Sequence, residues 1–197
     1  MALEETIEEK AKRIEIRRKE YQESRNYKYI TGYHGTTKDN AISIINDGLK
    51  FEVSQKEKNW LGNGIYFYRY YSDAAIWHNP DTDEASEDIF HVVVKVKRDE
   101  CFDLETDEDC KMFEEIVDSV YQQGMTSENQ QVQFHCMIMN LIWAEHPQLK
   151  VACGRFAAYE RLPNQLAMVE YRTQRREFCV RDNGVILQCT HIGNARM

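Results

Sequence analysis

The stretch 60–78, WLGNGIYFYRYYSDAAIWH, constrains this chain more than any other. Gly62 and Gly64 frame the start of an apolar run, and glycine lets the backbone approach a ligand closely because it has no Cβ. The run that follows predicts a short strand over 65–68. Such a strand holds the side chain of Tyr66 at a fixed place beside the glycine loop.

A short helix is predicted directly after this strand. Ser72 is a good N-cap for a helix that carries Ala74, Ala75 and Trp77. Tyr66 and Trp77 can then lie on the two sides of a flat ring, which suits a planar, electron-poor heterocycle better than a sugar or a peptide. Tyr71 replaces Trp77 in this role if the helix begins later. The alternative is that these aromatic residues only pack in the core.

The composition is that of a soluble, single-domain protein. The 197 residues are 42% hydrophobic and 29% charged, with a formal net charge of −8, and they suffice for one substantial core. No apolar run reaches the roughly 20 residues of a membrane helix, and the charged N-terminus has no secretory signal. We therefore expect one domain over 1–197, no membrane association and a cytoplasmic location, with secretion by a route that the sequence does not announce as the alternative. The negative charge gives an overall field that repels nucleic acid, although local patches can outweigh it.

The cysteines give no indication of a metal site. Six are present, at positions 101, 110, 136, 153, 179 and 189, and no pair has the CxxC spacing typical of zinc sites. We expect reduced thiols, those of Cys136 and Cys179 buried.

The N-terminal segment, 1–25, reads as a charged helix over 3–22. Glu8–Lys12, Glu9–Arg13 and Glu15–Lys19 are favourable pairs at spacing i, i+4. One interpretation is a solvated helix docked along the domain, and the other is a handle for a partner such as an inhibitor or antitoxin protein.

The rest of the chain predicts an α+β domain. A β-rich run at 27–33 precedes a helix over 40–46, which Asp39 caps and Gly48 ends in the left-handed conformation. Capping signals at Thr106 and Ser127 open two helices, which read as a helical insertion over 104–150. The remaining predicted elements are strands at 49–53, 89–96, 167–171, 177–181 and 185–189, a polar loop at 54–59 that can cover a ligand, and a tight turn at 182–184.

Three separated motifs resemble the ADP-ribosyltransferase superfamily. They are YHGT at 33–36 with the helix that ends in Gly48-Leu49, then LGNGIYF at 61–67, then REFCV at 176–180. The closer resemblance is to the diphtheria-toxin and poly(ADP-ribose) polymerase branch, whose signature is His, Tyr, Glu. The resemblance covers about 29–77 and 171–186, but neither the N-terminal segment nor about 103–165. It implies two facing, split β-sheets with NAD as co-substrate in the cleft, and a compact chain similar to bacterial toxin or effector members.

The family's roles carry over onto the matching positions. His34 would bond a ribose hydroxyl, and the backbone of Gly35, within the YHGT motif that Thr36 completes, would bond the nicotinamide amide. Tyr66 would stack on the nicotinamide ring, with Trp77 where polymerase-like members have a second tyrosine. The family's serine for the amide falls on Ala74, and the nearest hydroxyl is that of Ser72.

Glu177 is the residue that we expect to carry the chemistry. Cleavage of the nicotinamide–ribose bond develops positive charge on the ribose, which a nearby carboxylate stabilises. We expect Arg175 and Arg176 to lower its pKa and keep it ionised. A cation at position 175, where arginine-modifying relatives have an acidic residue, argues against an arginine acceptor. Arg172, Arg175 and Arg176 together favour an anionic acceptor or contact with the pyrophosphate of NAD.

The resemblance implies transfer of ADP-ribose from NAD to a macromolecular acceptor, either protein or nucleic acid, with release of nicotinamide. NAD hydrolysis is the first alternative, and a non-catalytic module that binds ADP-ribose or a partner is the second. Transfer of an RNA 2′-phosphate on the same fold would require a more basic surface.

Overall fold

The computed structural model describes residues 7–57, 59–75, 86–122, 131–158 and 173–194. The helices in these ranges are α1 (Ile7–Arg25), α2 (Lys38–Asn46), α3 (Tyr71–Ala75), α4 (Asp107–Gln122) and α5 (Gln131–Glu145), with single 3₁₀ turns at Arg98–Glu100 and Asn183–Val185. The strands are β1 (Tyr27–Thr36), β2 (Ile65–Tyr68), β3 (Asp88–Lys97), β4 (Cys101–Asp103), β5 (Val151–Ala158), β6 (Thr173–Val180) and β7 (Ile186–Asn194). The α+β class predicted from the sequence is confirmed.

The described strands form one mixed sheet in the order β4-β5-β6-β2-β1-β3-β7. Only β4 and β5 run parallel among these neighbours, and the other pairs are antiparallel. β1 pairs with β3 along ten residues, from Tyr27 opposite Lys97 to Thr36 opposite Asp88. In contrast, β1 meets β2 at a single register position, Tyr33 opposite Tyr68. The centre of the sheet is therefore its most weakly joined place.

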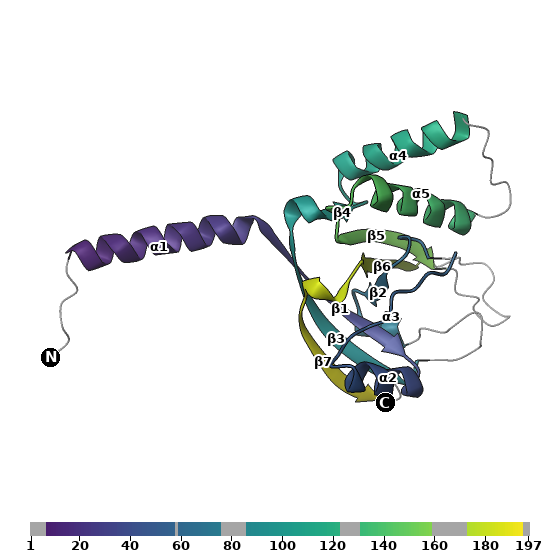
Figure 1. Ribbon diagram of the computed structural model, residues 1–197, viewed down its shortest axis with the longest axis horizontal. Coiled ribbons are helices and arrows are strands. Elements are labelled where there is room, and N and C mark those ends of the chain that lie inside the picture. Colours follow the sequence, from purple (N-terminus) through teal and green to yellow (C-terminus); the bar gives the residue numbers. More distant parts are fainter. Residues whose placement is uncertain (1–6, 58, 76–85, 123–130, 159–172, 195–197) are drawn as a thin grey trace.

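One face of the sheet, which carries His34 and Phe178, holds the first hydrophobic core. The alternation predicted for 89–96 is confirmed, because Phe90, Val92, Val94 and Val96 are all buried on this face. Helix α2 packs here through Ala41 and Ile44. Figure 1 shows α2 lying against the β1–β3–β7 side of the sheet. We call this the His34 face.

The opposite face, which carries Tyr66 and Glu177, holds the second core. Helices α4 and α5 lie beside the β4–β5 side of the sheet (Figure 1). They pack through residues such as Ile138, Met139 and Ile142 onto Ala152 and Cys179 of the sheet. The segment 104–150 thus supplies a large part of a core on the sheet itself. We call this the Glu177 face.

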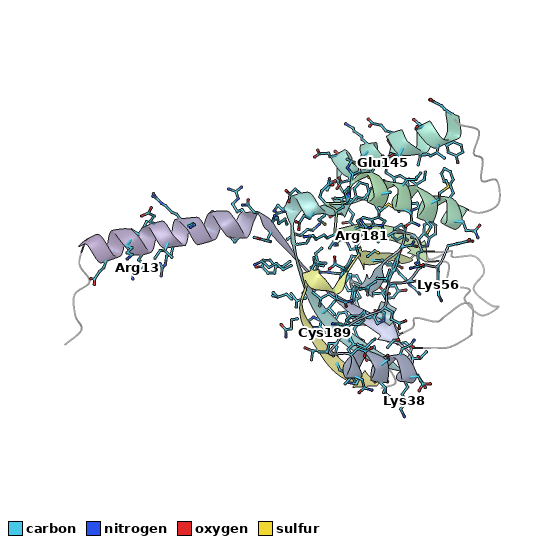
Figure 2. All side chains as sticks on the ribbon, viewed as in Figure 1. Arg13, Lys38, Lys56, Glu145, Arg181 and Cys189 are labelled. Atoms are coloured by element: carbon cyan, nitrogen blue, oxygen red, sulfur yellow. The ribbon has the colours of Figure 1, made fainter. Side chains whose placement is uncertain are left out.

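Helix α1 extends away from the rest of the structure, as Figure 1 shows. Figure 2 shows its side chains, Arg13 among them, standing clear of the sheet and the other helices. Ile14, Ile16 and Tyr21 are exposed, and charged side chains surround the helix rather than one apolar stripe. The prediction of a helix is confirmed, but its docking along the domain is wrong.

Some local predictions are confirmed, and others are wrong about which residue begins or forms an element. Gly48 has φ +72°, so the left-handed helix end is confirmed. The cap of α2 is Thr37 instead of Asp39, because the Thr37 side chain accepts the bond from the amide of Asn40. No strand forms over 49–53, and the next residue, Ser54, forms an isolated bridge with Gly64. β4 and β5 were not predicted, and the strand expected at 167–171 lies outside the described residues.

The start of α4 follows the predicted capping signal. The amide of Asp109 donates to the Thr106 hydroxyl at 3.3 Å. The Asp109 carboxylate, however, accepts from the amide of Asp103 at 2.7 Å instead of bonding back to the cap. This bond ties the first turn of α4 to β4. The second capping signal, at Ser127, lies outside the described residues.

All six cysteines are free thiols, and those of Cys136 and Cys179 are buried as expected. Among the described helices, none combines the length and the apolar character that crossing a bilayer requires. In the same residues, no group of three or more His, Cys, Asp or Glu side chains is arranged to hold a metal ion.

Candidate functional site

The centre of the sheet brings two of the three predicted catalytic residues to one face. Tyr33, Tyr68 and Glu177 are cross-strand neighbours on β1, β2 and β6. Because side chains alternate along a strand, these three share a face, and Tyr66 shares it as well. Burial is the main cause of the raised pKa of the Tyr66 hydroxyl. Cys179 raises this pKa further, and so does the nearby Glu177 carboxylate.

The hydroxyl of Tyr66 is bonded on both sides. It donates to the carbonyl oxygen of Gly62 at 2.8 Å and accepts from the amide of Leu61 at 2.7 Å. Burial raises the pKa of this hydroxyl far above its ordinary value, so it stays neutral. The glycine loop therefore fixes the ring of Tyr66 and does not leave its hydroxyl for proton transfer.

His34 lies on the opposite face but is bonded to the Tyr66 backbone. Its Nδ1 is 2.8 Å from the carbonyl oxygen of Tyr66, which connects β1 to β2 where they do not pair. The ring packs edge-on against Phe51, at 5.0 Å between centroids, and also contacts Phe67. Burial lowers the pKa of His34, and the bond to Tyr66 offsets this only in part. The imidazole is therefore neutral at physiological pH.

Gly35 lies in close contact with helix α3. A Cβ built on Gly35 would lie 2.1 Å from the carbonyl oxygen of Ala74 and 2.6 Å from the Ser86 hydroxyl. No side chain fits there, so this glycine is required for α3 to pack on β1. Thr36, the next residue, is buried at the end of β1, and its carbonyl oxygen accepts from the amide of Glu87.

Helix α3 begins two residues earlier than an N-cap at Ser72 predicts. Its first residue is Tyr71, so Ser72 lies exposed in the first turn and is not the N-cap. Tyr71 contacts the ring of Tyr33 edge-on, with centroids 5.8 Å apart. Trp77 lies outside the described residues, so its stacking role stays a prediction.

Glu177 lies in the middle of β6, although the strand was predicted to start at this residue. Its side chain is largely buried. Burial raises its pKa to about 7, although Arg175 lowers it in part, while Asp73 raises it further. The expectation that adjacent arginines hold this pKa low is wrong. Loss of hydration outweighs the one arginine that shares its face.

The predicted arginine patch is divided between the two faces of β6. Arg175 points to the Glu177 face, where its Nε is 4.0 Å from the carboxylate of Asp73. Arg176 points the other way and forms a salt bridge with Glu105, which also binds Arg155. Arg172 lies outside the described residues. Each described arginine of the trio therefore has a carboxylate beside it, and the two do not act as one cationic surface.

Two cavities border the sheet centre, and no residue lines both. The cavity of about 330 Å³ is lined by His34, Gly35 and Thr36, by residues of α2, and by the 50–56 segment. The cavity of about 250 Å³ is lined by Glu177, Arg176 and Phe178 of β6, with Lys28, Tyr29 and Arg69 opposite. Both cavities lie on the His34 face, because Arg176 and Phe178 point to that face. The Glu177 carboxyl points to the other face, where Tyr68 and Asp73 are its neighbours.

Two site residues were missed by reasoning from sequence. Tyr68 lies opposite Glu177 on the neighbouring strand. The pKa of the Tyr68 hydroxyl is well above its ordinary value, mainly because of burial and secondly because of the Glu177 charge. Asp73 of α3 lies close enough to influence both residues. The position of Tyr68, two residues after Tyr66 in the same strand, was a usable signal, whereas nothing in the sequence indicated Asp73.

The buried Glu177 carboxyl predicts a stability that falls as pH rises. Its folded pKa of about 7 exceeds the unfolded value of about 4.3, so the protonated form favours folding. This contribution is complete below pH 4 and is lost as pH rises through 7. From pH 5 to pH 8 we expect the free energy of unfolding to fall by up to about 3 kcal/mol relative to Glu177→Gln. Urea unfolding of both proteins at several pH values measures this, and parallel curves would contradict it.

Comparison with known proteins places these residues in a family. The model of the poly(ADP-ribose) polymerase catalytic domain matches residues 5–142, which is more than half of the chain and includes His34 and Tyr66. The match reaches into the helical region and stops before Glu177, so the role of Glu177 depends on its sequence motif and geometry. No curated protein and no solved structure matches the chain. The chain belongs to the family of poly(ADP-ribose) polymerase catalytic domains.

Proposed function

We propose that this protein transfers ADP-ribose from NAD to a macromolecular acceptor and releases nicotinamide. Catalytic domains of this family use NAD as substrate. The observation that carries the proposal is the bond from His34 to the Tyr66 carbonyl oxygen, at the place where β1 and β2 separate. Glu177 lies on the next strand, β6, opposite Tyr68 and thus two residues along from Tyr66.

The tautomer of His34 supports a role in binding a ribose hydroxyl. A carbonyl oxygen only accepts hydrogen bonds, so Nδ1 of the neutral ring carries the proton that bonds to Tyr66. Nε2 then has a lone pair and acts as an acceptor. A hydroxyl group donates to such a nitrogen, as the predicted contact with the nicotinamide ribose requires.

The cavity beside His34 is the proposed site of the ADP-ribose part of NAD. Its volume is about 330 Å³, and it contains the polar side chains of Asn40 and Ser43 from α2. Lys50 and Lys56 of the following segment line it as well, with Asp47 and Glu52 beside them. Amide and hydroxyl groups suit ribose oxygens, and the lysines suit a pyrophosphate. This cavity lies along the 54–59 loop that was predicted to cover a ligand.

Glu177 is the proposed catalytic residue. The bond between C1′ of the ribose and the nicotinamide nitrogen breaks, and nicotinamide leaves with the bonding pair. The positive charge that develops on the ribose is stabilised by the ionised carboxylate. Tyr66, whose hydroxyl is held by the glycine loop, presents its ring as a fixed surface for the nicotinamide. Trp77, Tyr71 and Ser72 remain proposed contacts to the nicotinamide.

The rate of nicotinamide release is expected to rise with pH through about 7. The carboxylate must be ionised to stabilise the positive charge, and burial raises the pKa of Glu177 to about 7. Initial rates at saturating NAD between pH 5.5 and 8.5 measure this dependence. The step near pH 7 should be absent from the residual rate of Glu177→Gln, and a step of equal size in that variant would assign the titration to another group.

The function is tested with NAD labelled on its adenylate part, offered with a cell lysate. Label on a macromolecule supports transfer, while nicotinamide release without macromolecular label indicates hydrolysis to free ADP-ribose. Absence of nicotinamide release would leave only the non-catalytic binding module. Nuclease and protease treatment of the labelled product then identifies the acceptor as nucleic acid or protein.

The exposed helix α1 supports, as part of this proposal, a role in binding an inhibitor protein. Ile14, Ile16 and Tyr21 are exposed on a helix that stands clear of the sheet. The proposed toxin or effector role rests on analogy with small bacterial members of the superfamily. An inhibitor protein that binds α1 would support it.

A further inference from the structure

The loop at 59–63 contains neither helix nor strand, although part of it is buried. Leu61 and Gly62 are among its buried residues, so their backbone groups need partners within the protein. The amide of Leu61 donates to the Tyr66 hydroxyl, and the same hydroxyl donates to the carbonyl oxygen of Gly62. The position of Tyr66 therefore depends on what holds this loop.

Helix α5 binds the backbone of the loop with its side chains. The Trp143 indole donates to the carbonyl oxygen of Leu61 at 2.9 Å. The Asn140 side-chain oxygen accepts from the amide of Asn63 at 2.8 Å. A Cβ built on Gly62 would lie 2.7 Å from that oxygen of Asn140 and 2.8 Å from the indole nitrogen. The loop is therefore in direct contact with α5, and only glycine fits between the two bonds.

His135 of the same helix bonds to the start of the loop. Its Nδ1 is bonded to the carbonyl oxygen of Trp60, and because that oxygen only accepts, Nδ1 carries the proton. Burial lowers the pKa of His135, although the bond to Trp60 acts against this. The Trp60 ring also stacks on Phe156 of β5, with centroids 5.1 Å apart. Side chains of α5 thus hold the loop at both of its ends.

Asn140 differs from the other two α5 residues because it is not an aromatic ring packed among others. Trp143 is part of the second core, and the His135 ring lies 4.6 Å from that of Phe113. Asn140 instead lines an open groove of about 580 Å³ together with Asn63. The bond from Asn140 to the loop can therefore be removed with little change to the core.

We propose that Asn140 is a positioning residue, which holds the loop so that the Tyr66 ring stacks on the nicotinamide of NAD. This rests on the proposed function and adds a residue that acts through Tyr66 instead of touching the substrate. The connection runs from Asn140 to the amide of Asn63, and from the backbone of Leu61 and Gly62 to the Tyr66 hydroxyl. Without the bond to Asn63 the loop is released on one side, and the ring is held less firmly for stacking.

The first test is the affinity for NAD in the Glu177→Gln background, where slow turnover leaves NAD intact during isothermal titration calorimetry. Asn140→Leu keeps a branched side chain but has no acceptor. It should raise Kd about 10-fold, the scale expected when a lost hydrogen bond leaves its donor unpaired. Asn140→Asp retains an acceptor oxygen at the same place and should keep Kd close to the parent value.

Kinetics and hydrogen exchange give two further readouts. Stacking holds the nicotinamide equally before and during bond cleavage, so Asn140→Leu in the active protein should raise KM about 10-fold and leave kcat unchanged. The amide of Asn63 should exchange faster in Asn140→Leu but not in Asn140→Asp. A role in stability alone would not separate KM from kcat in this way.

Two controls on α4 separate positioning from stability. Val120→Ala removes methyl groups from the same core and should lower the stability without changing Kd or KM. Gln122→Leu exchanges an exposed amide for a branched apolar side chain away from the loop, and should change none of these quantities. Asn140→Ala replaces Asn140→Leu if circular dichroism shows that the leucine variant is unfolded.

The proposal is overturned if Asn140→Leu and Asn140→Asp bind NAD equally well, or if Val120→Ala reproduces the loss of affinity. Absence of NAD binding by the parent overturns the proposed function and this proposal together. That outcome is distinguishable because it is seen before any change at Asn140 is made.

Discussion

Glu177→Gln is expected to lower the rate of nicotinamide release from NAD by roughly 100-fold or more, the usual scale for loss of one preorganised transition-state contact. The amide occupies the same volume in β6 but has no negative charge to stabilise the ribose cation. Because this charge acts mainly in the transition state, kcat and kcat/KM should fall together. Stopped assays of nicotinamide release at pH 8, where the parent carboxyl is ionised, measure both parameters.

The control for this substitution is Glu115→Gln on the exposed surface of α4, which should retain the parent rate. Circular dichroism and urea unfolding establish that Glu177→Gln is folded. A folded variant that releases nicotinamide and labels acceptors at the parent rate would end the assignment of Glu177 as the catalytic residue. The family assignment would stand, since the matched region ends at residue 142.

Trp143→Ala is expected to destabilise the whole domain by about 3–5 kcal/mol, as for other buried aromatic residues cut back to alanine. Trp143 on α5 is 3% exposed, and its indole nitrogen donates to the carbonyl oxygen of Leu61 at 2.9 Å. Arg181 lies over the ring and donates to the Trp143 carbonyl oxygen. The substitution therefore leaves a cavity and removes a bond to the loop that fixes Tyr66.

Urea unfolding followed by circular dichroism measures this loss, and Trp143→Phe should cost less because most of the ring volume stays. Tyr121→Ala on α4, where Tyr121 is 48% exposed, serves as the control with a small effect. One cooperative transition in each variant would show that α4 and α5 fold with the sheet. An early transition that melts the helices alone would instead make the helical segment 104–150 an independent unit.

The parts of the fold with a strong local signal were predictable. The strand at 65–68 is confirmed by β2, and the alternation at 89–96 by β3, because one buried face imposes a period of two. The capping signal at Thr106 and the glycine at 48 also depend on a few neighbouring residues. β4 has only three residues, and β5 contains Gly154 and no clear alternation, so neither could be identified without its partner strand.

The candidate site was predictable in its residues but not in its electrostatics. Alternation along a strand over 176–180 already indicates that Arg176 points away from Glu177. The raised pKa of Glu177 depends on burial beneath other elements and on Asp73 of α3, which only the folded chain brings near. The direction of α1 is equally a property of tertiary structure, since its charge pairs stabilise the helix without fixing where it lies.

The single register position between β1 and β2 has a mechanical consequence. β1 forms ten residue pairs with β3 but one with β2. The sheet therefore has two well-paired parts, β4-β5-β6-β2 and β1-β3-β7, that few backbone hydrogen bonds join. Rotation of one part about Tyr33 and Tyr68 would break few backbone hydrogen bonds, but it would separate side chains of the first core, in which Phe67 and Phe178 pack with Phe90. The two parts of the sheet are therefore held together by the first hydrophobic core and by the His34–Tyr66 bond more than by backbone pairing, and the packing of Phe51 against both Phe67 and Phe90 fixes how the two parts lie.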